Sequence, residues 1–113
     1  MKLNTVSDAL SCTVHFGPEG WESKEAAGVA AGDLMSDVLV QEGVNTLLVT
    51  ALNSDQVIRT ADIVEAAAVL MVSGKTPQKS VIQLAVESGM PLLSTSLSMY
   101  RACGILSSLE GEE

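Results

Sequence analysis

The sequence predicts a single α/β domain built on a small, mostly parallel sheet of about four to five strands flanked by helices. From Glu25 onward, apolar segments of strand length alternate with amphipathic segments of helix length, and polar or glycine-containing turns separate them. This alternation is typical of βαβ units. Hydrophobic residues make up 47% of the 113 residues, which is enough for the core of one domain. We expect residues 1–113 to form that domain, with an exposed loop over 17–25 and an acidic tail over 108–113.

Strands are predicted where apolar and polar residues alternate, or where a short apolar run is bounded by turn residues. The run 67–72 is apolar throughout, so it predicts a strand buried on both faces in the middle of the sheet. Pro91 has no backbone N–H and is therefore expected at the start of its strand or on an edge. The predicted strands cover residues 13–16, 26–31, 46–50, 67–72 and 90–94.

Helices are predicted where apolar residues recur three and four positions apart behind a residue suited to an N-cap. Two of them are expected over 4–11 and 34–41. Three more are expected after the predicted strands 46–50, 67–72 and 90–94. Gly89 is expected to end the fourth helix. The expected caps are Asp33, the cluster Asn53 to Asp55, Thr76 with Pro77 at the first helical position, and Thr95 with Ser96.

The charge and hydropathy of the chain exclude two classes of partner. The net charge of -8 and the pI near 4.4 are unsuited to a polyanion, so no nucleic acid is expected. The longest apolar run, 66–72, is far shorter than the ~20 residues of a membrane span. No apolar signal segment follows Met1, so we expect a cytoplasmic protein without a membrane partner. Cys12 and Cys103 lack metal-ligand spacing and are expected to be buried, reduced thiols.

Loops rich in hydroxyl groups and glycine follow the predicted parallel strands. Ligands of such sheets bind at the carboxyl ends of the strands, and these residue types with one lysine suit a phosphate or a sugar. The same residues also suit helix N-caps, so capping alone stays open as an alternative. The candidate ligand-binding residues are Gly32, Asp33, Thr50, Asn53, Ser73, Gly74, Lys75, Thr76, Ser94, Thr95 and Ser96.

No catalytic or metal-binding constellation is found. Residues 74–76 resemble the end of a phosphate-binding P-loop, but that pattern requires a glycine at the position of Val69. Asp33 and Asp37 share a helix face without a third ligand. No pattern places a serine, a cysteine or a second histidine near His15, so neither a catalytic triad nor a metal site is predicted. We expect no enzyme activity, no catalytic residue and no cofactor.

Several segments, in their order along the chain, resemble the DRTGG domain family. They are GDLMSDV (32–38), LLVT (47–50), VLMVSG (69–74) and MPLLST (90–95), followed by Tyr100. This family is similar to the N-terminal domain of HPr kinase/phosphorylase, and it also occurs between CBS domains in regulated inorganic pyrophosphatases. Free-standing copies occur in anaerobic bacteria, some encoded near iron-only hydrogenase genes. The resemblance implies a compact α/β fold like that N-terminal domain, dimerisation, and a regulatory or ligand-sensing role without kinase activity.

The sequence leaves two functional hypotheses. The first is a non-catalytic regulatory or ligand-sensing module that binds a small anionic metabolite or nucleotide at the loops after the strands. The alternative is a protein-interaction module that docks a partner enzyme, for which the resemblance suggests a hydrogenase-related redox enzyme. Charged residues make up only 18% of the chain, against a typical ~25%, which indicates surface covered by another subunit. A homodimer is therefore expected under either hypothesis.

Overall fold

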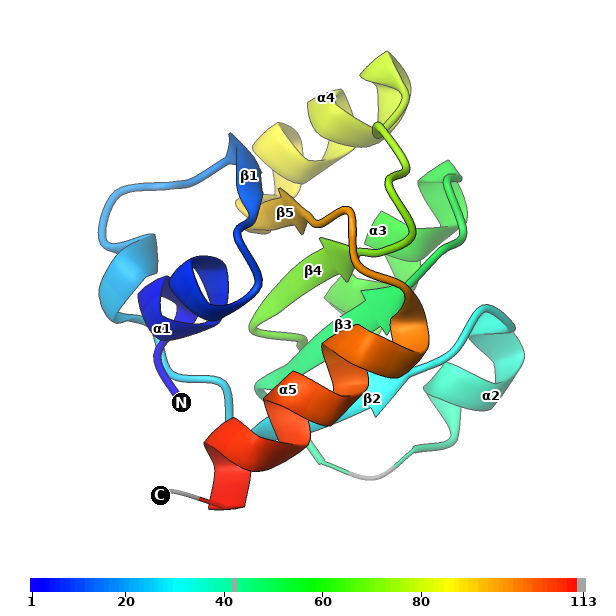
Figure 1. The fold of residues 1–113 in the computed structure, drawn as a ribbon. Coiled ribbons are helices and arrows are strands. Elements are labelled where there is room, and N and C mark those ends of the chain that lie inside the picture. Colours follow the sequence, from blue (N-terminus) through cyan, green and yellow to red (C-terminus); the bar gives the residue numbers. More distant parts are fainter. Residues whose placement is uncertain (42, 112–113) are drawn as a thin grey trace.

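The computed structural model describes residues 1–41 and 43–111, and it confirms the predicted α/β class. The strands are β1 (Thr13–Phe16), β2 (Gly28–Ala31), β3 (Thr46–Thr50), β4 (Ala68–Met71) and β5 (Leu92–Ser94). The helices are α1 (Leu3–Ala9), the short 3-10 helix η1 (Trp21–Ser23), α2 (Met35–Leu39), α3 (Asp55–Ile63), α4 (Lys79–Ser88) and α5 (Met99–Gly111). The five strands form one sheet in the order β1-β5-β4-β3-β2, with helices on both faces (Figure 1). Strands β2 to β5 run parallel, whereas β1 runs antiparallel to β5.

The sheet divides the buried side chains into two clusters, one on each face. Successive residues of a strand point to opposite faces, so β3 sends Leu47 and Val49 toward α1 and α5 and sends Leu48 toward α2, α3 and α4. Strand β4 alternates in the same way and is buried along its whole length. The prediction that this apolar run lies in the middle of the sheet is confirmed.

Pro91 lies immediately before β5, as its missing N–H requires. Its carbonyl accepts a hydrogen bond of 2.9 Å from the N–H of Val69, so the chain is already aligned with β4 before the strand begins. Gly89 ends α4 in the left-handed conformation, with a φ of 70°, and Ser54 caps α3 by accepting a hydrogen bond from the N–H of Gln56. The predictions for Pro91, Gly89 and Ser54 are therefore confirmed.

Three of the predicted caps are wrong. Helix α2 has Leu34 at its N-cap, and the carboxylate of Asp33 bonds to β3 and the residue after it instead. Helix α4 begins at Lys79 behind Gln78, two residues later than the predicted Thr76 and Pro77. Helix α5 begins at Met99, after the predicted Thr95 and Ser96, and the hydroxyl of Ser98 accepts a hydrogen bond from the N–H of Arg101. Each of these loops is longer than expected because its polar residues bond to neighbouring loops.

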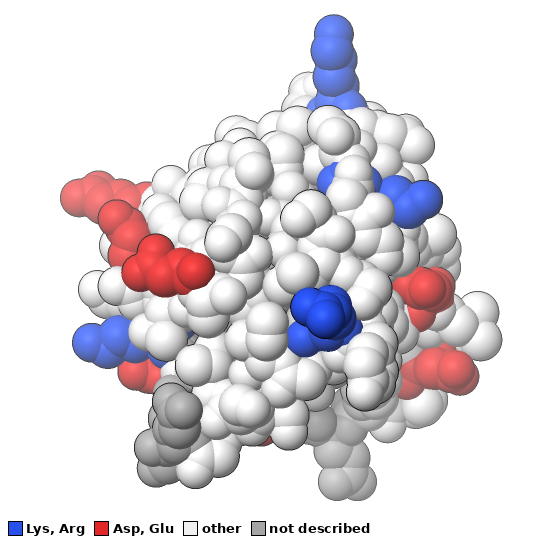
Figure 2. Space-filling view, viewed as in Figure 1, with Lys and Arg blue, Asp and Glu red and all other residues white. Residues whose placement is uncertain are grey.

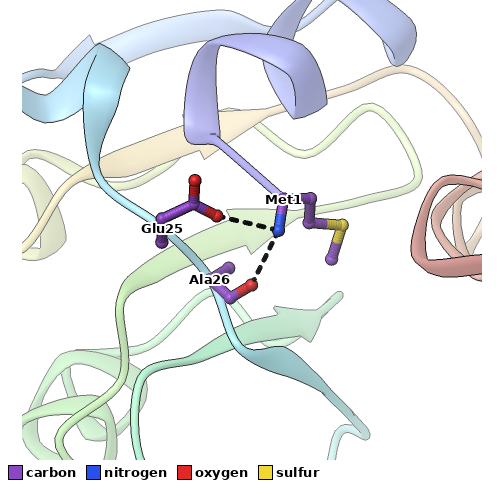
Figure 3. Close-up of polar contacts among 3 residues, drawn as sticks. All are labelled: Met1, Glu25 and Ala26. Carbon is purple, nitrogen blue, oxygen red and sulfur yellow. Dashed lines mark hydrogen bonds and ion pairs between the residues drawn. The ribbon is translucent and has the colours of Figure 1, made fainter. Parts of the chain in front are cut away.

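The segment 17–25 is mostly exposed, but it is not a featureless loop. It contains η1, and Trp21 packs against the cluster of buried side chains to which α1 and α5 contribute. The amino group of Met1 lies 3.1 Å from Glu25 Oε2 and donates a hydrogen bond of 3.1 Å to the carbonyl of Ala26 (Figure 3). These contacts fasten the end of the segment beside α1. Of the predicted acidic tail, residues 108–111 continue α5, and 112–113 lie outside the described residues.

The burial of β4 makes a prediction about stability. Leu70 is 0% exposed at the centre of the sheet, so Leu70→Ala leaves a cavity and should lower the free energy of unfolding by about 2–5 kcal/mol. Ile63→Ala, at a side chain that is 70% exposed, is the matched control and should change it by less than about 0.5 kcal/mol. Urea unfolding measures both. Equal effects of the two variants would contradict the assignment of β4 to the centre of the core.

Candidate functional site

A polar pocket of about 370 Å³ lies where the carboxyl ends of β4 and β5 meet the beginning of β1. Parallel strands bring their carboxyl ends to one edge of the sheet, and the antiparallel β1 adds residues from the other end of the chain because Thr13 pairs with Ser94. Six of the predicted ligand-binding residues line the pocket, and three that the sequence did not indicate join them. The predicted ones are Gly74, Lys75, Thr76, Ser94, Thr95 and Ser96, and the additional ones are Ser11, Thr13 and His15.

Two loops, β4–α4 and β5–α5, are held together by backbone hydrogen bonds and form much of the pocket wall. The N–H of Ser73 donates to the carbonyl of Leu97 at 2.7 Å, and the N–H of Gly74 donates to that of Thr95 at 3.1 Å. Ser73 and Gly74 both have left-handed backbones, with φ of 66° and 70°, and this turn exposes the side chain of Lys75. Ser73 itself does not line the pocket.

The side chain of Thr95 has a structural role, although the residue lines the pocket. Its buried hydroxyl donates a hydrogen bond of 2.7 Å to the carbonyl of Leu10 and accepts one of 3.3 Å from the N–H of Leu97. The threonine thereby ties α1 to the β5–α5 loop. Four other hydroxyl groups of the pocket, on Ser11, Thr13, Thr76 and Ser96, lie on exposed residues, whereas Ser94 is buried.

The sequence analysis expected no partner for His15. In the structure this histidine pairs with a serine. His15 Nε2 lies 2.7 Å from Ser94 Oγ, and Ser94 is only 9% exposed. Burial lowers the pKa of His15 below its usual value of 6.5. No sequence pattern indicates this pair, because the two residues are 79 positions apart and the register of β1 against β5 shifts between Val14 and Phe16. Among the hydrogen bonds of the described residues, none joins the other ring nitrogen to a carboxylate.

The remaining predicted site residues lie on the same edge of the sheet but outside the pocket. Asp33 Oδ1 accepts a hydrogen bond of 3.1 Å from Thr50 Oγ1 and one of 2.7 Å from the N–H of Ala51, which joins the ends of β2 and β3. Asn53 donates to the carbonyl of Thr76 and accepts from the N–H of Gln78, which joins the β3–α3 and β4–α4 loops. The predicted residues that the structure leaves outside are Gly32, Asp33, Thr50, Asn53 and Ser73.

The electrostatic setting of the pocket differs from that of the whole chain. Lys75 lines it and no carboxylate does, although the chain carries a net charge of -8. On the face seen in Figure 2, acidic side chains lie toward the left and right margins, and basic side chains lie at the top, at the upper right, in the centre and also at the left margin. The strand ends that lead into the pocket lie in the upper part of the same view in Figure 1. The local field at this edge therefore suits an anion better than the net charge suggests.

The described residues do not indicate a metal site, a reactive thiol or a membrane-spanning helix. Within residues 1–41 and 43–111, no three His, Cys, Asp or Glu side chains are placed to hold a metal ion. Burial raises the pKa of the Cys12 thiol to about 11 and also raises that of Cys103, so both half-buried thiols stay protonated near neutral pH. In the part of the chain that the structure describes, every helix is too short or too polar to cross a lipid bilayer.

The contacts of Asp33 make it a structural residue, which a variant can test. Asp33→Ala removes the acceptor of two hydrogen bonds, one of them from the buried hydroxyl of Thr50, and should lower the free energy of unfolding by about 1–2 kcal/mol. Asp37→Ala, at an exposed carboxylate of α2 without a described partner, is the control and should leave it unchanged within about 0.5 kcal/mol. Thermal unfolding measures both variants. If Asp33→Ala is as stable as Asp37→Ala, the assignment of a structural role to Asp33 is wrong.

Comparison with known proteins shows the fold and no more. No family model matches the chain, and no curated protein matches it either. Among solved structures, the chain is similar to the CBS and DRTGG domains of the regulatory region of Clostridium perfringens pyrophosphatase, crystallised with its activator diadenosine tetraphosphate. The TM-score is 0.78 at 15% sequence identity, and the match covers 93% of this chain and 45% of that chain, so this chain spans less than half of that neighbour. The chain therefore has an α/β fold like that of a DRTGG-containing regulatory region.

Proposed function

We propose that this chain is a non-catalytic regulatory or ligand-sensing module that binds a small anionic metabolite or nucleotide in the pocket at the carboxyl ends of β4 and β5. One observation carries the proposal: the β4–α4 and β5–α5 loops, β1 and the turn before it place five hydroxyl side chains, Lys75 and His15 around one pocket, with no carboxylate among the lining residues. The hydroxyl-bearing residues, apart from the structural Thr95, are Ser11, Thr13, Thr76, Ser94 and Ser96.

Backbone groups add to the anion-binding chemistry of this pocket. The N–H groups of Lys75, Thr76 and Ser96 form no hydrogen bond within the described part of the chain, and all three residues line the pocket. Unpaired backbone N–H groups near a cation are the usual donors to phosphate oxygens in proteins. The net charge of -8 opposes an anion only weakly, because charges more than about 8 Å away are screened at physiological salt.

The dimensions of the pocket support a small ligand. Its volume of about 370 Å³ lies near the lower end of the ~300–1,000 Å³ typical of small-molecule sites. A phosphorylated metabolite or the phosphate-bearing part of a nucleotide fits this range. The structural neighbour is a regulatory region complexed with a dinucleotide activator, which supports a regulatory role and nucleotides as one ligand class to be tested.

The proposal is non-catalytic because the Ser94–His15 pair lacks the partner that a hydrolytic triad uses. In a triad, a carboxylate on the second ring nitrogen holds the imidazole and stabilises its charged form. The described residues place no carboxylate on that nitrogen of His15 and none among the pocket-lining side chains. We therefore assign the pair to binding.

The proposed ligand class is tested by thermal unfolding in the presence of nucleotides and phosphorylated metabolites. A ligand at ~100 times its dissociation constant should stabilise the fold by ~2.7 kcal/mol. Lys75→Ala should weaken this stabilisation, whereas Lys79→Ala, which removes an exposed lysine of α4 outside the pocket, should leave it unchanged. If no ligand shifts the unfolding temperature, or if both variants respond like the unmodified protein, the pocket is not the site.

The homodimer expected under either hypothesis has one observation in its favour, an apolar groove of about 750 Å³ along α5. Tyr100 is 88% exposed there, and Gly104, one turn further on, has nothing within 4 Å of where a Cβ would stand. A projecting ring beside a gap on the same helix face is self-complementary, as a two-fold contact requires. The groove is lined by Met99, Tyr100, Arg101, Cys103, Gly104, Ile105 and Ser108.

We propose a second copy of this chain as the occupant of that groove, which gives the expected homodimer. The lining residues include no acidic side chain, although the chain has 14 Asp and Glu residues, so two identical acidic chains repel each other less at this face than elsewhere. A homodimer and a ligand pocket are compatible, because the groove and the pocket share no lining residue.

Light scattering after size-exclusion chromatography tests the dimer. The unmodified protein should elute as a dimer, and Tyr100→Glu should convert it to a monomer because the contact would bury a charge without a partner. Ile63→Glu, at a side chain of α3 that is 70% exposed, is the matched control and should stay dimeric. A monomeric unmodified protein, or a Tyr100→Glu variant that remains a dimer, would rule out a second copy at α5.

A further inference from the structure

We propose that the Ser94–His15 pair makes the pocket selective for a doubly charged oxyanion, such as a terminal phosphate, and that binding takes up a proton on His15. The inference rests on the proposed function of the pocket. It adds the class of the ligand and the residue that selects it, and it starts from the 2.7 Å contact between His15 Nε2 and Ser94 Oγ.

The selectivity for an anion follows from the hydrogen-bond donors and acceptors of His15 and Ser94. A serine hydroxyl has one hydrogen to donate and two lone pairs to accept with, and a charged imidazole donates from both nitrogens. When His15 is charged, its Nε2–H must donate to Ser94 Oγ, so the hydrogen of Ser94 is free for another acceptor. Ser94 is 9% exposed and lines the pocket, so an anion bound there is well placed to accept it.

In the neutral ring the direction of this hydrogen bond follows the tautomer. If Nε2 carries no hydrogen, Ser94 donates to the ring and presents only lone pairs to the pocket, which repel an oxyanion. Protonation of His15 therefore makes two changes at once. It adds a positive charge beside that of Lys75, and it fixes Ser94 as a donor toward the pocket.

The charged groups around His15 are few. Lys75 lines the same pocket, and β5, the strand that pairs with β1, contains no titratable residue. Helix α4 packs against β1 and contributes Lys79 and Glu87, both exposed, and the exposed Asp8 lies near the end of α1 before β1. No carboxylate lines the pocket, so the bound anion is the main source of negative charge next to the ring.

The sign of the pH dependence follows from linkage. Burial lowers the pKa of His15 below 6.5, so the neutral ring predominates in the free protein at pH 7. A dianion bound near the ring raises the pKa of His15. The affinity for the dianion therefore increases as the pH falls, and this increase levels off below the pKa of His15 in the free protein. A rise of about one unit corresponds to an affinity about tenfold higher at acid pH. A singly charged anion produces a smaller rise because its attraction to the imidazolium is weaker.

Sulfate is the probe that separates the titration of the protein from that of the ligand, since sulfate keeps both charges between about pH 5 and pH 8. Its affinity is measured at constant ionic strength with chloride as the background, and nitrate serves as the singly charged comparison. We expect sulfate to bind about tenfold more tightly at about pH 5 than at about pH 8, and nitrate to change less. His15→Gln retains a side-chain amide that can bond to Ser94 but cannot titrate, so its sulfate affinity should not depend on pH.

The unmodified protein provides a second readout that needs no variant. The chain contains one histidine, so its ring C–H signals in proton NMR belong to His15 without further assignment. Their titration should give a pKa about one unit higher in saturating sulfate than in chloride.

An unchanged pKa, or an affinity for sulfate that is the same at both pH values, would overturn the inference, and so would a failure of sulfate to bind at about pH 5. A nucleotide or metabolite that stabilises the protein through Lys75 with no pH dependence would overturn it as well, while leaving the proposed function intact.

Discussion

The fully buried strand β4 is the constraint on which the rest of the structure depends. A strand covered on both faces must be apolar at every position, and its neighbours β3 and β5 must run parallel to it so that helices can cross over both faces. Parallel neighbours deliver their following loops to one edge. The polar residues after β3, β4 and β5 are therefore gathered there by the topology, and the chemistry of the site is a consequence of how the core is built.

The polar residues at this edge then divide into two groups. Asp33, Asn53 and Thr95 use their side chains to join one loop to the next, and such bonds leave little capacity for a ligand. Lys75 has donor capacity that no described residue uses, and the hydrogen of Ser94 is free when His15 Nε2 donates to it; both residues face a common pocket. The first group fixes the positions of the second. This division explains how one short chain can have many cap-like residues and still form the pocket that we propose as a ligand site.

The sequence predicted the strands well and the loop contacts poorly, for physical reasons. Strands 13–16 and 46–50 agree with the structure to the residue. Strand 46–50 is buried over four of its five residues and therefore needs a simple apolar pattern, and 13–16 was recognised by its alternation and by the turn residues that follow it. The caps at Asp33 and Thr95 were wrong because a carboxylate or hydroxyl bonds a neighbouring loop as readily as its own helix, and a local pattern cannot distinguish the two. Thr76 is instead held through its backbone carbonyl by Asn53, and α4 begins only after Gln78, which also bonds to Asn53. His15 was missed because its partner is set by the antiparallel register of β1, which depends on tertiary packing.

The most direct test of the central claim is a titration of the isotopically labelled protein with inorganic phosphate, followed through its backbone amide resonances. If the pocket is an anion site, the largest shifts fall on the amides of Lys75, Thr76, Ser94 and Ser96, and those around Asp33 and Asn53 move little. Shifts that are spread over the surface, or that concentrate on α5 instead, would contradict the assignment of the pocket as the binding site.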